Sequence, residues 1–519
     1  MKGYVLGIDF GTSSVKVICI ARRGDSRTAM QPYEILSGMD PGADPESWWM
    51  AMRKGLRALT PWMAEAGKIN AIGLTAQVGT YLLLDTSKTG SGFTVTSWRK
   101  GCGEKQLFEA KRKFSESFFN EHISMNHPKL ASYPIPRILH FQEDLPEEWE
   151  RAEKLLQPKD YIYHRLTGTY ASDPFSWRGL ANLADCTFHE ELLHQIGVSR
   201  EKLPSLYGPG EAPGHLLQAI ADELGLPCGI PVFIGCNDFF SSLLGMGIMK
   251  SGQCFDVSGT SEHIGRIRNA AAREDDQIKT AASGKDAPIM NAAARVDNFV
   301  SGPYLKNFAQ YGVTANSGSS MNWAFKTFGR DQEWISLENR PEGHGNLPPP
   351  VFLPYLSGER APIWDAKARG VFFGLSGDHQ AKDLAYSVLE GVVFSLYHIW
   401  TLMSGEVGTE VRVGGGAAFD DELNRLKSSI FQMPFGVMRE KESGALGAAM
   451  FAAIGTGWFS SYDEAINSWV KVDHTVEPDG KLGKILRPRF GIYTDLYPAL
   501  KESFGKWADI EERSLHGFC

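Results

Sequence analysis

Residues 4–20 have the sequence YVLGIDFGTSSVKVICI, in which an apolar run ends at Asp9 and a second run begins after a Gly-Thr-Ser-Ser turn at 11–14. Two apolar runs joined by a short Gly- and Ser-containing turn predict a β-hairpin with strands at 4–9 and 15–20. The turn offers backbone N–H groups and hydroxyls with no large side chain in the way. Such a turn is suited to holding phosphate oxygens.

Asp9 is the residue of this stretch that most needs an explanation. A carboxylate at the end of the first strand repels phosphate directly. It becomes favourable if it holds a magnesium ion, usually through water, because Mg²⁺ keeps several waters and takes one or two carboxylates. From this stretch alone two interpretations stay open: a polar hairpin turn without a role, or one side of a magnesium and phosphate site.

The composition narrows the class of protein. With 519 residues the chain is too long for one ordinary core, which predicts two domains. Its 43% hydrophobic and 22% charged residues are typical of soluble globular proteins, and no apolar run approaches the roughly 20 residues of a membrane span. The net charge is −8 and Lys and Arg are scattered, which argues against nucleic acid as a partner.

The N-terminus and the cysteines indicate the compartment. Residues 1–4 lead directly into the first strand and do not resemble a signal peptide. The seven cysteines are widely spaced and contain no C-x-x-C pair, which argues against a zinc knuckle and against a disulfide framework. We therefore expect a reduced, cytoplasmic protein.

The first half of the chain alternates strand and helix patterns. Strands are predicted at 69–75, 80–85 and 229–238, and 150–167 is predicted to be helical. A further helix is expected to begin at Asp44-Pro45-Glu46, which combines an N-cap residue, proline at the first helical position and an acid in the first turn.

The opening pattern recurs near the midpoint of the chain. Residues 253–267, QCFDVSGTSEHIGRI, again have an apolar strand, an acid, a Gly-Thr-Ser turn and a second strand. Asp256 to Ser261 resembles Asp9 to Ser13 with one residue inserted, which indicates an internal duplication. We therefore predict two similar α/β domains, residues 1–246 and 247–519, with a cleft between them.

The second half contains a glycine-rich strand end. A helix is predicted near 380–402, a strand at 410–415, and helices at 420–432 and 443–455. The run Gly414-Gly415-Gly416 permits close approach of backbone to a flat ring or a phosphate, although a purely structural turn is equally open. Phe419 stands where a Rossmann fingerprint needs glycine or alanine, and no Walker-type motif occurs, so neither nucleotide fold is expected.

Asp238 lies in GCNDFFSSLLGMG, at the end of a buried strand and the start of a predicted helix. Its first interpretation is an N-cap. Its second is a general base, which takes a proton from a hydroxyl as that hydroxyl attacks a phosphoryl group. The residue alone does not decide between these roles.

Taken together, these segments resemble the FGGY carbohydrate kinase family nearly end to end. LGIDFGTSSVK and VSGTSE are similar to its two phosphate motifs, and VGGGAAF with ESGALGAAMFAA to its adenosine-binding region. The most specific block is FLPYLSGERAPIWDAKARGVFFGLSGDHQAKDLAYSVLEGVVFSL at 352–396, which resembles the C-terminal signature of the family. The resemblance implies two actin-like ATPase (ribonuclease H-like) domains flanking an ATP and sugar cleft.

The resemblance also implies a role for each matching residue. Asp238 falls on the catalytic base and Asp9 on the residue associated with Mg²⁺. Phosphate and nucleotide contacts fall on further positions: Thr12, Ser13, Gly259, Thr260, Gly318, Gly415, Gly416 and Ala417. ATP and Mg²⁺ are the implied cofactors, and a homodimer is the implied assembly because it is common in the family.

The expected sugar pocket departs from xylulokinase-like members of the family. Gln77-Val78-Gly79 lacks the histidine of their Met-His-Gly, Phe239 replaces the asparagine after the catalytic aspartate, and Trp98 to Cys102 lacks the carboxylate and arginine of their Trp-x-Asp-x-Arg. Hydroxyl readout sets sharp specificity, so these losses indicate an altered acceptor unless the pocket simply tolerates drift. Gln77, Trp98 and Lys100 are candidate contacts.

We therefore expect an ATP-dependent kinase that phosphorylates a small sugar, first of all a ketopentose similar to xylulose or ribulose. A polyol, a deoxy-ketose or a sugar acid is the alternative acceptor. A non-catalytic sugar or nucleotide sensor on the same scaffold is a rival from another class, but a sensor has no need of Asp238. A chaperone-like or filament-forming ATPase lacks support because the C-terminal signature is that of carbohydrate kinases.

Overall fold

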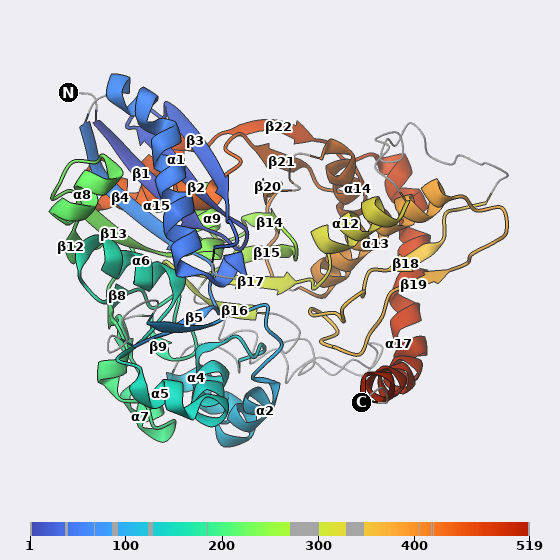
Figure 1. Cartoon of the computed structure of the whole chain (residues 1–519). Coiled ribbons are helices and arrows are strands. Elements are labelled where there is room, and N and C mark those ends of the chain that lie inside the picture. Colours follow the sequence, from blue (N-terminus) through green and yellow to red (C-terminus); the bar gives the residue numbers. More distant parts are fainter. Residues whose placement is uncertain are drawn as a thin grey trace. The chain divides into compact units, whose positions relative to one another are not determined.

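The computed structural model of the chain describes residues 3–36, 40–66, 68–85, 92–122, 128–183, 185–269, 300–328, 347–403, 405–416, 418 and 420–516. The chain divides into two compact units (Figure 1). Unit 1 contains Met1–Gly247 together with Glu442–Val470, and unit 2 contains Ile248–Lys441 together with Lys471–Cys519. Each unit has a mixed sheet, which confirms the predicted α/β fold with two sheet-containing domains.

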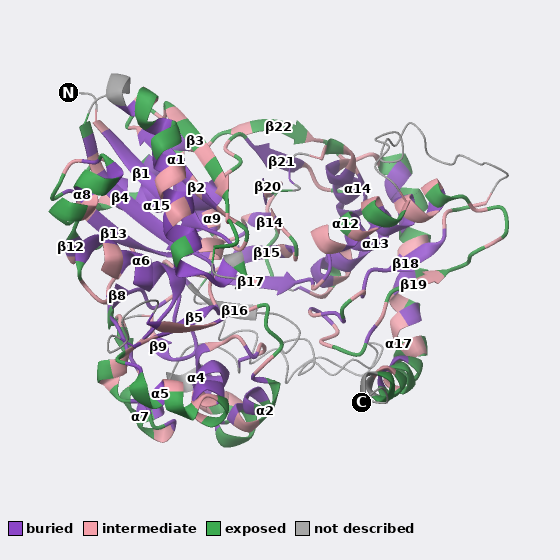
Figure 2. Ribbon diagram, viewed as in Figure 1, coloured by how far each residue is buried: buried purple, intermediate pink, exposed green. Residues whose placement is uncertain are grey.

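The sheet of unit 1 has six strands in the order β12-β13-β4-β1-β2-β3. The predicted hairpin is its centre, because β1 pairs antiparallel with β2 and parallel with β4, which in turn pairs parallel with β13. The edge strand β3 was not predicted, since its exposed polar residues give no apolar run (Figure 2). The strands are β1 (Gly3–Phe10), β2 (Ser14–Ala21), β3 (Ser26–Pro32), β4 (Lys68–Ala76), β12 (Gly214–His215) and β13 (Pro231–Asn237).

Side chains alternate along β1, so its two faces pack against different helices. The even-numbered side chains, from Tyr4 to Phe10, join an apolar core with α1 (Pro45–Ala66). Asp44 caps α1 as predicted, because its Oδ1 accepts the N–H of Glu46 at 3.0 Å. The odd-numbered residues, Gly7 and Asp9, instead face α15 (Ser443–Gly455).

Helix α15 lies directly against the backbone of the sheet. A Cβ atom at Gly7 would lie 2.0 Å from the carbonyl oxygen of Ala445, and one at Gly73 would lie 2.0 Å from that of Ala448. Both positions therefore require glycine. The segment 443–455, which was predicted as a helix of small residues, comes after most of unit 2 in the sequence. Its small side chains let it pack in the core of unit 1.

A smaller layer of unit 1 carries the three-stranded sheet β6-β5-β7. The single helix predicted for 150–167 is wrong: α5 ends at Arg151, β7 intervenes, and α6 restarts at Pro158 with Gln157 as its cap. Proline at the first helical position marks this new start. The elements of the layer are β5 (Tyr81–Leu84), β6 (Phe93–Thr96), β7 (Lys154–Leu156), α2 (Glu104–Lys113), α3 (Glu116–His122), α4 (Pro134–Asp144), α5 (Pro146–Arg151), α6 (Pro158–Thr167) and α7 (Glu190–Gln195).

The remaining elements of unit 1 are short strands and helices around these two sheets. The helix α9 follows β13 directly and contacts α15. The bounds are β8 (Ala171–Ser172), β9 (Ala181–Asn182), β10 (Thr187–Phe188), β11 (Ser205–Leu206), α8 (Gln218–Leu224), α9 (Asp238–Gly245), α16 (Tyr462–Trp469) and the 3₁₀ turns η1 (Pro41–Ala43) and η2 (Arg200–Lys202).

The sheet of unit 2 repeats that of unit 1. Its order is β16-β17-β15-β14-β20-β21-β22, with antiparallel pairs on one side of β14 and parallel pairs to β20 and β21 on the other. The β14–β15 hairpin occupies the place of β1–β2, which supports the predicted duplication. The strands are β14 (Cys254–Ser258), β15 (His263–Arg268), β16 (Val300–Tyr304), β17 (Asn307–Val313), β20 (Val411–Gly415), β21 (Phe435–Met438) and β22 (Val472–Val476).

The inserted residue changes the direction of the second acid. Asp9 lies two residues before the glycine of its turn, whereas Asp256 lies three residues before Gly259. Successive side chains of a strand point to opposite faces, so Val257 takes the place that corresponds to Asp9. Asp256 therefore points to the opposite face and is not a second copy of Asp9.

The helices of unit 2 form its apolar core with this sheet, and α13 is buried along most of its length (Figure 2). The long helix α17 was not predicted, because Pro488 and Pro498 interrupt its helical pattern. The other elements are α12 (Gly318–Phe328), α13 (Ala381–Leu402), α14 (Asp421–Phe431), α17 (Gly480–His516), β18 (Val351–Leu353) and β19 (Val371–Phe373). Within the described ranges, every helix is too short or too polar to cross a membrane.

Candidate active site

Three of the predicted site residues of unit 1 lie together at one end of its sheet. Asp9 is opposite Thr75, and Asn237 is opposite Ala76, so β1, β4 and β13 end side by side. Parallel strands present their carboxyl ends at the same edge, where ligands of open α/β sheets bind. Asp9, Gln77 and Asp238 emerge from these three neighbouring strand ends.

Asp238 is the first residue of α9, and the cap of that helix is Asn237. The Asn237 side chain accepts the N–H of Phe240 at 2.9 Å, so the N-cap interpretation of Asp238 is wrong. The Asp238 carboxylate accepts the N–H of Phe239 at 2.8 Å. Burial, together with the negative charge of Asp9, raises the pKa of Asp238 to about 7. A carboxyl group with such a pKa is suited to exchange protons near neutral pH.

Asp9 is buried beside a lysine that the sequence analysis did not single out. Its Oδ2 lies 3.6 Å from Nζ of Lys16, and within the described ranges its Oδ1 has no hydrogen-bond partner. Burial raises the pKa of Asp9, and Lys16 lowers it. Asp9 and Lys16 are directly opposite in the hairpin, so the register of the predicted hairpin contained the signal for this pair.

Two hydrogen bonds from Tyr33 fix the turn between Asp9 and Lys16. The Tyr33 hydroxyl donates to the carbonyl oxygen of Gly11 at 2.8 Å, and the Tyr33 N–H donates to that of Ser13 at 3.0 Å. Thr12 is half-buried and Ser13 is exposed, so this predicted phosphate turn reaches the surface.

The donor set around Asp9 fits Mg²⁺. The orphaned Oδ1 of Asp9 is a buried acceptor that a cation or its water shell would satisfy. Across the part of the chain that the structure describes, no three acidic, His or Cys side chains converge as a metal cage. One carboxylate completed by water and substrate phosphates is the arrangement that Mg²⁺ prefers.

Gln77 was predicted to contact the sugar, but both polar groups of its side chain bond within the protein. Its Nε2 donates to the Gly42 carbonyl oxygen at 2.8 Å, and its Oε1 accepts the indole N–H of Trp98 at 3.0 Å. Gln77 therefore orients Trp98, whose ring is only half-buried. Lys100 is exposed in the same turn, and the neighbouring Arg99 pairs with Asp40 at 2.6 Å.

Unit 2 brings its predicted nucleotide residues together in the same way. The Gly318 N–H, which begins α12, donates to the carbonyl oxygen of Gly259 at 3.1 Å. The Gly416 N–H donates to that of Ser258 at 3.1 Å, and Gly415 adopts the positive φ of 90° that favours glycine. Gly259, Thr260, Gly318, Gly415 and Gly416 thus surround one turn. Ala417 lies outside the described residues.

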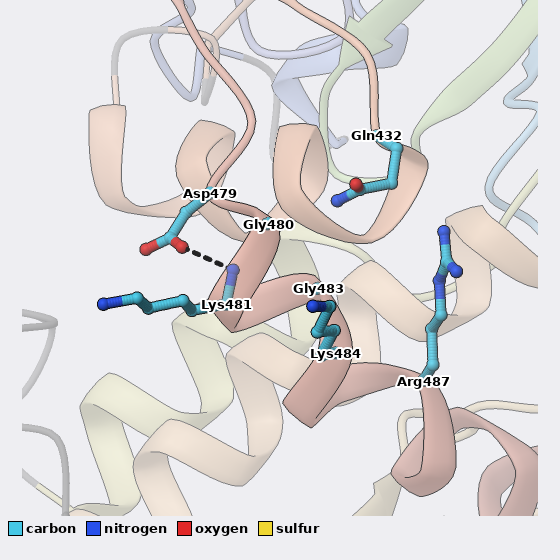
Figure 3. Close-up of a pocket in the computed structure, with 7 residues that line it drawn as sticks. All are labelled: Gln432, Asp479, Gly480, Lys481, Gly483, Lys484 and Arg487. Carbon is cyan, nitrogen blue, oxygen red and sulfur yellow. Dashed lines mark hydrogen bonds between the residues drawn. The ribbon is translucent and has the colours of Figure 1, made fainter.

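A hollow of about 600 Å³ lies elsewhere in unit 2, at the start of α17 (Figure 3). Its lining contains Lys481, Lys484 and Arg487 and a single acid, Asp479. The Asp479 carboxylate accepts the N–H groups of residues 481 and 482 and pairs with Arg425 at 3.0 Å. The hollow therefore offers no available base and is not the candidate active site.

Comparison with known proteins agrees with this geometry. Residues 4–245 match the FGGY family of carbohydrate kinases, N-terminal domain, and residues 287–456 match its C-terminal domain. A xylulose kinase of Staphylococcus epidermidis is 27% identical over 522 residues, which cover 97% of this chain and 98% of the relative. The crystal structures of a xylulose kinase and a gluconate kinase from Lactobacillus acidophilus both align with a TM-score of 0.81 at 26% identity, covering 97% and 98% of this chain and 100% of each neighbour.

Proposed function

The chain belongs to the FGGY family of carbohydrate kinases, and we propose that this ATP-dependent sugar kinase uses Asp238 as its general base. The observation that carries the proposal is the Asp238 carboxylate itself. It stands at a strand end next to Asp9, the helix cap role belongs to its neighbour, and its pKa is about 7. Such a group accepts the proton of a hydroxyl that attacks the γ-phosphoryl group.

The residues around Asp238 supply the rest of the chemistry. Asp9 would hold Mg²⁺ through its free oxygen, and the ion would neutralise phosphate charge. The ammonium of Lys16 lies next to Asp9 and against Gly11, where it faces the turn of Thr12 and Ser13. Phosphoryl transfer depends mainly on positioning and charge, so these groups suffice without a covalent intermediate.

For the acceptor we propose a ketopentose of the xylulose or ribulose type. The full-length similarity to proteins named xylulose kinase supports this choice. The Trp98 ring, held by Gln77, gives the pocket an apolar wall against which a small sugar ring or chain can lie.

A sugar acid is the second candidate, and Arg137 is the observation that favours it. This guanidinium is 1% exposed, and it forms no ion pair among the described residues. Its Nη1 donates to Sγ of Cys102 at 2.6 Å, at the end of the turn that begins with Trp98, and its Nε has no hydrogen-bond partner among the described residues. A buried cation without a counter-charge is costly, and a substrate carboxylate would supply that charge.

An acceptor screen tests both candidates. We expect ADP release with at least one of xylulose, ribulose, xylitol, a deoxy-ketose and gluconate in a coupled assay. If gluconate is the substrate, Arg137→Met should lower its kcat/KM by about 10- to 100-fold, the worth of a charge-assisted hydrogen bond. With a ketopentose as substrate the same variant should change kcat/KM by less than about threefold. ADP release at background with every acceptor, while ADP still binds, would instead identify a sensor.

The pKa of Asp238 predicts the pH dependence of the reaction. The base works as the carboxylate, so kcat/KM for the sugar should rise with pH through about 7 and then level off. Below that pKa the rate constant should fall about tenfold per pH unit. The profile is measured at Mg·ATP concentrations well below its KM, so that it reports the metal-free site to which this pKa belongs, with the coupling enzymes doubled as a control. A flat profile between acidic and alkaline pH would contradict the assignment of the base.

A further inference from the structure

A buried charge cluster lies beneath the second Gly-Thr turn, within unit 2. The Lys427 ammonium lies 2.7 Å from Oδ2 of Asp256 and 2.5 Å from Oε1 of Glu262, and all three side chains have zero exposure. Lys427 comes from α14, Asp256 from β14, and Glu262 from the end of the turn. The cluster thus joins a helix to both ends of the β14–β15 connection.

Glu262 is the member that fastens the turn. Its Oε1 also accepts the Ser258 hydroxyl at 2.7 Å, so the two ends of the turn are clipped to each other. Its Oε2 accepts the hydroxyl of Ser317, the residue before α12. Its backbone N–H and carbonyl oxygen both bond to Thr314, at 3.1 and 3.0 Å. Glu262 therefore fixes the turn and the start of α12 at once.

The predicted nucleotide contacts lie on the outer side of this fastened turn. Gly259 and Thr260 accept the N–H groups of Gly318 and Ser319, at 3.1 and 3.2 Å. A Cβ atom at Gly318 would lie 2.5 Å from the Gly259 carbonyl oxygen, so the contact is already at its closest. A shift of Glu262 would therefore move the turn and the start of α12 together.

Lys427 is the cation of the cluster and lies against both of its carboxyl groups. Lys427 lowers the pKa of Glu262 to about 2, and both carboxylates raise the pKa of Lys427. Burial and the charge of Glu262 raise the pKa of Asp256 well above its ordinary value. The Lys427 ammonium therefore offsets the negative charge of the carboxyl groups that lie under the turn. Without Lys427 the turn would rest on buried negative charge that repels phosphate.

We propose that Lys427 is a positioning residue for nucleotide binding, which acts through Glu262 to hold the Gly259–Thr260 turn in its phosphate-binding shape. The inference rests on the proposed function, because it assumes that this turn receives the phosphates of ATP. Lys427 has no exposed surface, so it does not touch the nucleotide itself. Its effect on affinity must pass through the turn.

The test compares two buried ion pairs of the same unit. Lys427→Met should weaken Mg·ADP binding, measured by calorimetry without sugar, by tenfold or more and raise the KM for ATP similarly. The KM for the sugar should change less than twofold. The control is Arg489→Met, which breaks the buried pair of Arg489 with Glu390, away from the turn. It should lower the melting temperature but leave Mg·ADP affinity within twofold.

Each outcome decides the proposal. Equal losses of ADP affinity in the two variants, or unchanged affinity in Lys427→Met, would overturn it. If Lys427→Met does not fold, Glu262→Gln keeps the shape of the side chain and should still weaken ADP binding selectively; normal affinity in that folded variant would also overturn it. Failure of the wild-type protein to bind Mg·ADP would instead refute the proposed function.

Discussion

The Asp238→Asn variant is expected to lose about 10²–10⁴-fold in kcat while it binds Mg·ADP and sugar nearly as well as the parent protein. An amide has the shape of the carboxylate and keeps an oxygen for the N–H of Phe239, so α9 should begin unchanged. It cannot accept the proton of the attacking hydroxyl. The loss should therefore fall on turnover, measured as ADP release, and not on the dissociation constants.

Two variants of unit 1 serve as controls for this loss. Asp222→Asn removes an exposed carboxylate of α8 and should leave kcat unchanged. Asn237→Ala removes the cap of α9 and should lower stability by about 0.5–2 kcal/mol with a smaller loss of turnover than Asp238→Asn. Turnover within threefold of the parent in Asp238→Asn would exclude the residue as the base.

The Gly447→Val variant is expected to be the most damaging substitution for folding. A Cβ atom at Gly447 of α15 would lie 1.9 Å from the carbonyl oxygen of Ser241 in α9. That oxygen belongs to the backbone of the neighbouring helix. No side chain can rotate to relieve that overlap. We expect a loss of about 3 kcal/mol or more, a large part of the typical 5–15 kcal/mol of a folded domain. Thermal unfolding and the soluble yield measure it.

Gly491→Val is the matched control, since it makes the same change at an exposed helical glycine. Nothing lies within 4 Å of a Cβ atom at Gly491 in α17, and valine is a slightly better helix former than glycine. This variant should fold with an unchanged or slightly higher melting temperature. If both variants melt at the temperature of the parent, the tight approach of α15 to α9 is not what stabilises unit 1.

Sequence patterns predicted those elements of the fold that depend on neighbouring residues. The hairpin at Asp9, the start of α1 at Pro45 and the helix of small residues at 443–455 follow from alternation, capping and composition. The break between α5 and α6 was missed, because the apolar spacing continues through the short β7. A strand of three residues is too short to change the apolar period of the surrounding sequence.

The site was predictable only in part, because long-range contacts determine the rest. Strand ends located Asp9 and Asp238, but the cap at Asn237 and the engagement of Gln77 with Trp98 depend on tertiary structure. The link of Glu262 to Lys427 joins residues 165 positions apart, and nothing in either segment indicates the other. Buried charge pairs of this kind become visible only once the elements are packed.

The return of residues 442–470 to unit 1 has a consequence for biosynthesis. The sheet of unit 1 is complete in the nascent chain by Gly247, but α15, which covers its Gly7 and Gly73, emerges about 200 residues later. At about 5–20 residues per second, roughly 10–40 s pass between the two events. During that interval the nascent unit 1 exposes a bare glycine-lined sheet face, so the ribosome-bound chain is the form in which this protein most needs protection by chaperones.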